Sequence, residues 1–198
     1  MVTQPSPRSM SVEEWRALER ANPDTKYEYI DGNVYMMSGG SFNHARIAQN
    51  MVAELNNFFG DGPCSAYNSD VRVRLSEERY TLPDMSVTCS EHDQGTGDEV
   101  ETPLLIAEVL SDSTEARDRG RKFGYYRACP TIQEYVLIAT RYQTVEVYRR
   151  TSEGWTSYRV YGPGEEVELE SLDVRIPLAT LYRRTTVCEG LDDVEGDL

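Results

Sequence analysis

The chain has 198 residues, with 34 acidic against 20 basic side chains and a formal net charge of −14 at pH 7. This length suits a single domain, and a hydrophobic share of 39% is enough to build a core. The acidic balance argues against a nucleic-acid binder with a uniformly basic surface, but it leaves room for a local basic stripe or a metal-dependent site.

Sequence features that report on location point to the cytoplasm. The chain has no run of 18 apolar residues, so no membrane-spanning helix and no membrane partner are expected. The first ten residues lack the apolar segment of a signal peptide. The four cysteines form no C-x-x-C pair, which disfavours a structural zinc site. We therefore expect reduced, partly buried thiols.

The N-terminal third predicts a helix, a hairpin and a second helix. Ser11 and Glu14 have the spacing of a capping box, which predicts a helix over 11–20. Two Tyr-rich runs around Asp31-Gly32 predict a β-hairpin. Apolar residues then recur at helical spacing over 43–59, and Asn43 is a candidate N-cap for this helix.

The middle of the chain predicts three strands. Residues 67–75 alternate between polar and apolar side chains, and residues 82–89 place Asp84 on the face opposite Met85 and Val87. The acidic, Gly-containing stretch 90–101 is expected to be a solvent-exposed loop. The stretch PLLIAEVL at 103–110 is apolar on both faces, which is typical of a central strand.

The remainder predicts one helix followed by β-structure. Asp112 and Glu115 resemble a second capping box for a helix over 113–128 that ends before Pro130. Four strand-like segments follow: 133–139, 144–150, 155–161 and 166–176. We expect one α/β domain over 1–187, in which a mixed sheet carries a helix on each face. Residues 188–198 hold five acids and no base, which predicts a disordered tail.

Two acidic residues interrupt strands that otherwise look like core. An ionised carboxylate in an apolar setting is costly unless it is paired or binds a metal. Glu108 can form a buried ion pair with an arginine of the helix at 117–127. Alternatively, Glu108 and Asp84 meet on neighbouring strands and hold a hard divalent cation, because Mg²⁺ needs only one or two carboxylates plus waters and substrate phosphates.

The order of a Pro-Asp pair, a strand glutamate and a lysine resembles the PD-(D/E)XK nuclease superfamily. More closely, the chain resembles the bacterial Uma-two family of restriction-endonuclease-like proteins over roughly residues 10–182. The stretches that carry the resemblance are KYEYIDGNVYMMSGGSFNH, DVRVRL, LPDMSV, PLLIAEVLSDSTEARDRGRKFGYYRA and IQEYVLI. The resemblance implies a restriction-endonuclease-like α/β core of the α+β type, with an extra N-terminal hairpin and a β-rich C-terminal part.

The resemblance also implies a site. Asp84 and Glu108 would be the ligands of Mg²⁺ (or Mn²⁺), but Leu110 stands where the motif has its lysine. The lysine would then be Lys122 on the next helix, whose long flexible stem can reach a site on a neighbouring element. The other interpretation of Lys122 is a solvated i,i+4 surface pair with Asp118.

Three further residues are candidates. The resemblance places an acid at Glu28, and Asp70 is a candidate third carboxylate for the metal. Either one is equally an ordinary solvated or salt-bridged acid. His44 lies in the first turn of its helix, where it is either a polar cap or a phosphate contact.

The resemblance implies metal-dependent hydrolysis of DNA, with DNA as the partner. Four arginines on the Lys122 helix would form the DNA-facing surface: Arg117, Arg119, Arg121 and Arg127. Two alternatives stay open. One is a catalytically silent module that binds nucleic acid or protein, which Leu110 and the negative charge favour. The other is a phosphoesterase that acts on RNA or a smaller substrate.

A homodimer is predicted from aromatic residues in the C-terminal part, because exposed apolar patches often mark partner surfaces. The aromatics expected at the surface are Tyr142, Tyr148, Trp155, Tyr158 and Tyr161.

Overall fold

The computed structural model of the chain describes residues 9–37 and 39–190. The first half contains α1 (Val12–Ala21), β1 (Tyr27–Ile30), β2 (Asn33–Met36), α2 (Phe42–Phe59), β3 (Ser65–Asn68), β4 (Arg72–Ser76), β5 (Arg79–Thr81), β6 (Met85–Thr88), η1 (Glu91–Asp93) and β7 (Glu99–Val100). The second half contains β8 (Leu105–Val109), α3 (Glu115–Arg117), η2 (Asp118–Lys122), α4 (Phe123–Ala128), β9 (Glu134–Ile138), β10 (Val145–Thr151), β11 (Gly154–Tyr161), β12 (Glu166–Leu169), η3 (Glu170–Leu172), β13 (Val174–Pro177) and α5 (Leu178–Leu181).

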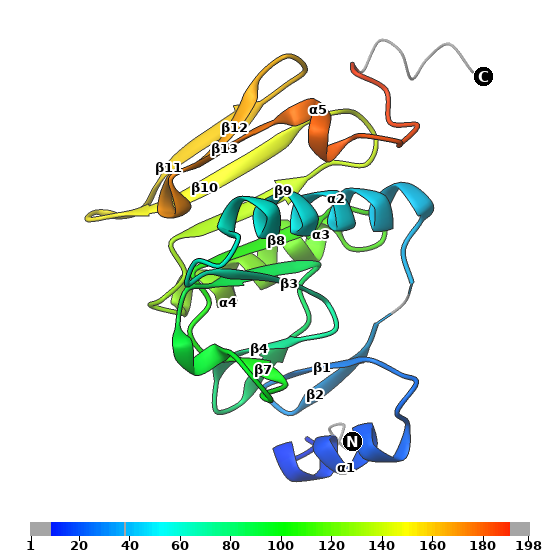
Figure 1. Ribbon diagram of the computed structural model, residues 1–198. Coiled ribbons are helices and arrows are strands. Elements are labelled where there is room, and N and C mark those ends of the chain that lie inside the picture. The colour runs from blue at the N-terminus through cyan, green and yellow to red at the C-terminus, as the bar shows by residue number, and fades with distance from the viewer. Residues whose placement is uncertain (1–8, 38, 191–198) are drawn as a thin grey trace, which may run out of the picture.

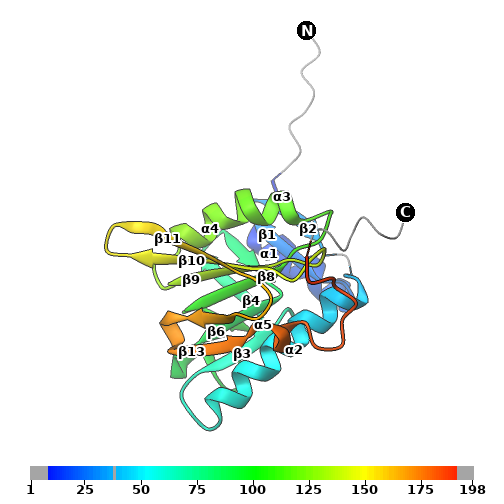
Figure 2. The same ribbon diagram turned by 90° about the horizontal axis from the view of Figure 1, so that it is seen from above.

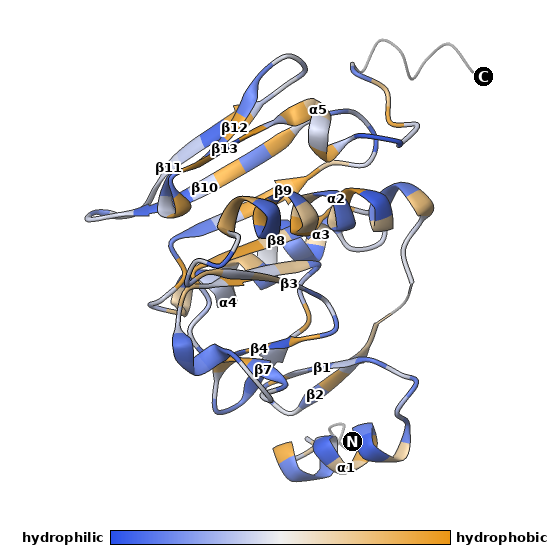
Figure 3. Ribbon diagram, viewed as in Figure 1, coloured by the Kyte–Doolittle hydropathy of each residue, from blue (hydrophilic) through white to orange (hydrophobic). Residues whose placement is uncertain are grey.

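A six-stranded mixed sheet forms the centre of the molecule (Figure 1). Its strand order is β11-β10-β9-β8-β6-β3, in which β8 pairs parallel with β9 and antiparallel with β6. All five residues of β8 are buried, as are all five of β9. Figure 3 shows the same two strands as mostly hydrophobic. The expectation of a central strand within 103–110 is therefore confirmed.

Helices cover both faces of this sheet (Figures 1 and 2). On one face, α2, α5 and the β12–β13 hairpin pack on Leu105, Ala107 and Val109 of β8. On the other face, Tyr126 of α4 and Val73 of β4 pack with Ile106. Successive side chains of a strand point to opposite faces, so both cores depend on the same strand. The fold class agrees with the expected α/β arrangement of a mixed sheet flanked by helices.

A second, five-stranded sheet has the order β2-β1-β5-β4-β7 and carries α1. Trp15 of α1 is fully buried and packs between Tyr29 and Tyr80. The capping box of Ser11 and Glu14 is present at the start of α1. The β1–β2 turn has positive φ at both Asp31 and Gly32, as a two-residue type I′ hairpin turn requires. Both N-terminal predictions are confirmed.

Two predicted strands are wrong as continuous elements. The segment at 67–75 divides into β3 and β4, which belong to different sheets. The break falls where the Asn68 side chain accepts a hydrogen bond from the Asp70 backbone amide at 3.0 Å, a local turn that competes with strand pairing. The segment at 166–176 is a hairpin of β12 and β13, and Asp173 between them has a φ of 52°.

Two predicted helix caps are also wrong. Ser41, not Asn43, accepts the capping hydrogen bond at the start of α2, and Asn43 lies inside the first turn. No side chain caps the start of α3, and Asp112 instead pairs with Arg141 at 2.7 Å. The end of α4 before Cys129 and Pro130 is as predicted.

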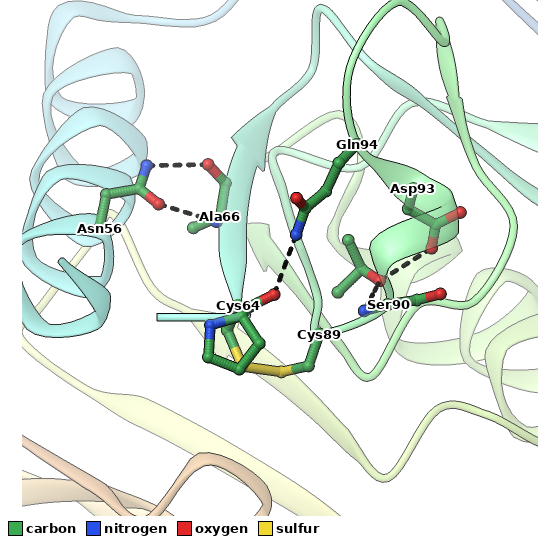
Figure 4. Close-up of a disulfide and its surroundings, with 9 residues drawn as sticks. Asn56, Cys64, Ala66, Cys89, Ser90, Asp93 and Gln94 are labelled. Atoms are coloured by element: carbon green, nitrogen blue, oxygen red, sulfur yellow. Dashed lines mark hydrogen bonds between the residues drawn. A yellow bond between two sulfur atoms is a disulfide. The ribbon is translucent and has the colours of Figure 1, made fainter. Parts of the chain in front are cut away.

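The expectation of four reduced thiols is wrong for two of them. Cys64 and Cys89 form a disulfide at one end of the β3–β6 pair (Figure 4). Ser65 of β3 lies opposite Thr88 of β6, so the two residues just outside this pair face each other. A search for C-x-x-C spacing cannot detect a bond across 25 residues. Cys129 and Cys188 remain free.

The stretch at 90–101 is not wholly a solvent loop. Asp93 is only 8% exposed, and its carboxylate accepts hydrogen bonds from the Thr88 hydroxyl, from the Thr102 hydroxyl and backbone amide, and from the Glu101 backbone amide. Figure 4 shows Asp93 close to the disulfide end of β6. This carboxylate therefore fixes the segment between β6 and β8.

The expected aromatic surface is also wrong in large part. Tyr161 is fully buried, and Tyr148 and Trp155 pack on Phe123. Tyr158 is 52% exposed, the most exposed of the five. The homodimer stays a prediction without this support. No helix among the described residues is long and apolar enough to cross a membrane, and the predicted disordered tail lies mostly at 191–198, outside the described residues.

Candidate active site

The candidate site surrounds the side chain of Glu108, which projects from the same face of the sheet as Ile106 and Leu110. Glu108 is 3% exposed and faces the helix that carries Lys122 and the small sheet that carries Glu28. A pocket of about 670 Å³ opens here, and its lining includes His44, Asp84, Glu108, Asp118 and Lys122. Four of these five residues are site candidates predicted from the sequence. The fifth, Asp118, is expected from the sequence only as a surface partner of Lys122.

Hydrogen bonds from backbone amides to carboxylates link Asp84 to the strand segment of Glu108. The Asp84 amide donates to Glu108 Oε2 at 3.3 Å, and the Val109 amide donates to Asp84 Oδ2 at 2.8 Å. Asp84 precedes β6, whose Met85 is paired with Ala107 of β8. Strand pairing therefore holds the two carboxylates side by side, as the sequence predicts.

Lys122 lies within this group. Its Nζ is 2.7 Å from Glu108 Oε1, 3.0 Å from Glu28 Oε1 and 3.9 Å from Asp118 Oδ1. Lys122 and Asp118 are each 3% exposed, so the interpretation of their pair as a solvated surface contact is wrong. The interpretation of Glu108 as the partner of an arginine is also wrong, because its cation is Lys122 and the arginine of this group, Arg117, pairs with Glu28.

The backbone around Lys122 is a π-helical turn, η2, between α3 and α4. Such turns insert an extra residue into a helix and are frequent at functional sites. Here the turn directs both Asp118 and Lys122 inward, while Tyr126, one turn later, donates its hydroxyl to Glu108 Oε1 at 2.7 Å. Asp118 and Tyr126 lie four residues before and after Lys122, and this helical spacing is the signal that points to them in the sequence.

His44 approaches the site from α2. Its Nε2 is 3.1 Å from Asp84 Oδ2, so its side chain is neither a cap nor a surface group. Burial disfavours the charged imidazole, but the hydrogen bond to Asp84, the charges of Asp84 and Glu108 and the Val109 carbonyl raise the pKa of His44. Gly40 packs against this ring, because a Cβ at Gly40 would lie 2.7 Å from His44 Nδ1.

The site has more carboxylates than cations. Four carboxylates (Glu28, Asp84, Glu108 and Asp118) face the two permanent charges of Lys122 and Arg117. Burial raises the pKa of Glu108 to about 8; Lys122 opposes the rise, and the negative charges of Asp84, Asp118 and Glu28 add to it. Burial alone would lower the pKa of Lys122, but Glu108, Glu28 and Asp118 raise it, so the ammonium keeps its charge.

Asp70 lies outside this group. Its side chain is 68% exposed and pairs with Lys26 at 2.7 Å, and it does not line the pocket. The hydrogen bond from Lys26 lowers the pKa of Asp70. The structure therefore brings together Asp84, Glu108, Lys122, Glu28 and His44 and leaves Asp70 in the turn between β3 and β4.

Two of the four arginines predicted to face DNA form ion pairs within the protein. Arg117 pairs with Glu28 and lies over the Tyr35 ring, and Arg119 pairs with Glu115 and Glu146. Arg121 and Arg127 are exposed. Two of the four arginines are therefore available to a phosphate backbone without breaking an ion pair.

The donor set fits one class of metal. No three His, Cys, Asp or Glu residues in the described part of the chain form a cluster able to hold a metal by themselves. Zinc normally takes three or four such ligands, whereas Mg²⁺ and Mn²⁺ accept one or two carboxylates and complete their shell with water and phosphate oxygens. Asp84 and Glu108, adjacent and in an acidic pocket, fit the second class.

Comparisons with known proteins identify the family of this chain. Residues 12–179 match the model of a family described as "Putative restriction endonuclease". The chain belongs to this family, Uma2. The uncharacterized protein slr1290 of Synechocystis is 34% identical over 175 residues, which cover 88% of this chain and 92% of that protein. The uncharacterized protein sll1609 of the same organism is 34% identical over 153 residues, 75% of this chain and 86% of that one.

A solved structure shares the fold. The crystal structure of "a putative nuclease belonging to DUF820" from Anabaena variabilis has a TM-score of 0.70 and 20% sequence identity, and the match covers 87% of this chain and 97% of that one. Together with the family match, this confirms the predicted Uma2 membership and fold.

Proposed function

We propose that this Uma2 protein is a metal-dependent endonuclease that hydrolyses phosphodiester bonds of DNA. One observation carries the proposal: the carboxylates of Asp84 and Glu108 adjoin each other in an open pocket, with the Lys122 ammonium 2.7 Å from Glu108. Family membership and the nuclease named in the related structure support the reaction class.

The chemistry assigns each side chain a task. Asp84 and Glu108 would hold Mg²⁺ or Mn²⁺, which when bound polarises a phosphoryl oxygen and lowers the pKa of a coordinated water. In the hydrolysis, a water oxygen bonds to phosphorus while the bond to a sugar oxygen breaks and that oxygen takes a proton. Lys122, kept charged by three carboxylates, stabilises the developing negative charge or orients the water.

The remaining side chains position this group. Glu28 and Tyr126 bind Lys122 and Glu108 respectively, which limits their rotation. His44 binds Asp84 and lines the pocket, where it can contact a substrate phosphate. These contacts fix the reacting groups before substrate arrives, and preorganisation of this kind is a large part of catalysis.

The test is cleavage of supercoiled plasmid and of a labelled oligonucleotide with Mg²⁺, with Mn²⁺ and with EDTA. The parent should cut only with metal, and Asp84→Asn and Glu108→Gln should each lose at least about a hundredfold in rate, the scale expected when charge stabilisation is removed from a site. Asp70→Asn is the matched control, because Asp70 is exposed and outside the pocket. Equal cleavage by parent and both variants would contradict the proposal.

A catalytically silent binding module remains the second candidate, because Leu110 occupies the usual lysine position and the net charge is −14. It predicts oligonucleotide binding with no metal-dependent cleavage. A phosphoesterase of small substrates predicts the reverse: hydrolysis of a small phosphodiester such as bis(p-nitrophenyl) phosphate, with no cleavage of DNA. DNA cleavage, oligonucleotide binding and hydrolysis of the small phosphodiester, measured side by side, therefore separate all three functions.

A further inference from the structure

Exposed arginines without acidic partners gather beside the pocket. Most arginines in the described part of the chain pair with a carboxylate, as Arg72 does with Glu19. Arg46, Arg183 and Arg184 are exposed, and no ion pair is found for them among the described residues. Arg121 and Arg127 of the Lys122 helix also have no ion pair among the described residues, so the first three arginines are distinguished by coming together from distant parts of the sequence.

These arginines come from two segments that lie side by side. Arg46 is on α2, and Arg183 and Arg184 follow α5 (Figures 1 and 2). Asn50 of α2 donates to the Leu181 and Arg183 carbonyls, both at 2.9 Å. Asn43 exchanges hydrogen bonds with Thr186, receiving from its backbone amide at 3.1 Å and donating to its hydroxyl at 3.1 Å. The arginine segment is thus fixed along α2.

Arg184 has a strained backbone. Its φ is +61°, in the left-handed region that non-glycine residues rarely adopt. Such a conformation costs free energy and persists only where its surroundings enforce it, which in proteins is often at a functional surface. Here the Asn43 and Asn50 contacts on either side enforce it.

An exposed aromatic side chain completes the surface. Phe42, the first residue of α2, is 97% exposed. Arg46 follows it by four residues and therefore lies on the same face of the helix. Phe42, Arg46, Gln49 and Arg184 line a groove of about 620 Å³. This groove shares Ser41 and Asn43 with the pocket that holds Asp84 and Glu108, so the two adjoin each other.

We propose that Phe42, Arg46, Arg183 and Arg184 form a strand-binding surface for the nucleic acid whose phosphodiester enters the pocket. The arginines bind backbone phosphates, and Phe42 stacks on an unpaired base next to the cut. This inference rests on the proposed nuclease function and names its substrate class: a polymer with a locally single-stranded segment, rather than a small phosphodiester. Positive charge along the backbone with an aromatic ring under a base is how proteins bind single strands.

The test measures binding without cleavage. A fluorescein-labelled single-stranded oligonucleotide is titrated with protein in EDTA at several salt concentrations, and anisotropy gives the affinity. Arg46→Gln with Arg184→Gln should lower the salt slope of log K by about 1.4, because each phosphate contact on a single strand contributes about 0.7. Phe42→Ala should weaken binding by about tenfold, the loss expected for one stacked base.

Matched controls come from the same chain. Arg159→Gln with Arg175→Gln makes the same change in charge at arginines that already pair with acids. Phe58→Ala removes an aromatic ring that is 59% exposed near the other end of α2. Both controls should bind like the parent. Arg184→Gly replaces Arg184→Gln if the latter unfolds, because glycine tolerates positive φ.

The outcomes separate the two proposals. Variants that bind like the parent, or controls that weaken binding equally, overturn the strand-binding surface. Metal-dependent cleavage of supercoiled plasmid by the parent tests the proposed function independently. Plasmid cleavage together with unaffected binding in the variants would contradict the strand-binding surface alone, and selective loss of binding with no cleavage of DNA by the parent would contradict the nuclease function alone.

Discussion

Lys122 is the residue on which the site depends. It is buried with Glu108, Glu28 and Asp118 around it, so its charge offsets part of theirs. Removing one partner of a buried ion pair leaves an uncompensated charge and is strongly destabilising. The lysine therefore contributes to folding as well as to the proposed chemistry.

Replacing Lys122 with methionine should destabilise the protein by about 3–5 kcal/mol in EDTA at pH 9, where Glu108 is ionised in the parent, because Glu108 then loses its cation in a buried setting. Urea unfolding measures the change. Lys26→Met is the matched control, since Lys26 pairs with Asp70 in an exposed setting and its loss should cost below about 1 kcal/mol. Adding Glu108→Gln to Lys122→Met should recover part of the loss. Equal costs for the two lysine variants would show that Lys122 is not a buried partner.

The raised pKa of Glu108 predicts a pH dependence. Glu108 binds its proton more tightly in the folded protein, with a pKa of about 8, than in the unfolded chain, where it lies near 4.5. Without metal, stability should therefore fall as pH rises from about 4.5 to 8 and then level off. The melting temperatures of the parent and of Glu108→Gln in EDTA measure this effect. Between about pH 4.5 and 8, the melting temperature of the parent should fall relative to that of Glu108→Gln. A constant difference from pH 4 to 9 would contradict the raised pKa.

At the scale of helices and strands, hydrophobic periodicity predicted the buried segments but not the turns and caps that end them. The apolar run of β8 and the helical spacing of α2 follow from burial, which sequence patterns report directly. Asn68, whose side chain starts a turn, divides one predicted strand into two, and Ser41 rather than Asn43 caps α2. These outcomes depend on single hydrogen bonds, and hydrophobic periodicity does not register them.

Asp93 holds the segment between β6 and β8. Asp93→Asn should cost about 1–3 kcal/mol, because an amide nitrogen replaces one of the oxygens that accept from the buried Thr88 hydroxyl and from the Thr102 backbone amide. Burial alone would raise the pKa of Asp93, but the Thr102 and Glu101 hydrogen bonds outweigh it and lower it. The parent's advantage is thus full above about pH 4 and shrinks in stronger acid. Thermal unfolding at several pH values measures it, with the exposed Asp98→Asn as control.

At the scale of the molecule, the site forms where three layers meet. The sheet supplies Glu108, the helix with the π turn supplies Lys122, and the small sheet supplies Glu28. The sequence could indicate Asp84, Glu108 and Lys122, because each stands out from its local pattern. It could not place Asp70 or join Cys64 to Cys89, because both outcomes depend on how distant segments pack.

The strand-binding surface has the same origin. Arg46 and Arg184 are far apart in the sequence and become neighbours only because α2 and the segment after α5 cover one face of the sheet. The sequence instead pointed to the arginines of the Lys122 helix, of which Arg117 and Arg119 are held in ion pairs. Charge counts along one helix cannot show which arginines remain unpaired.

In the proposed function, Asp84 and Glu108 together hold one divalent cation. Calorimetric titration of Mn²⁺ into the parent, Asp84→Asn, Glu108→Gln and the control Asp70→Asn tests it without any substrate. We expect one ion per chain for the parent and for Asp70→Asn, and loss of that binding in each of the other two variants. Unchanged stoichiometry and affinity in Asp84→Asn and Glu108→Gln would contradict it.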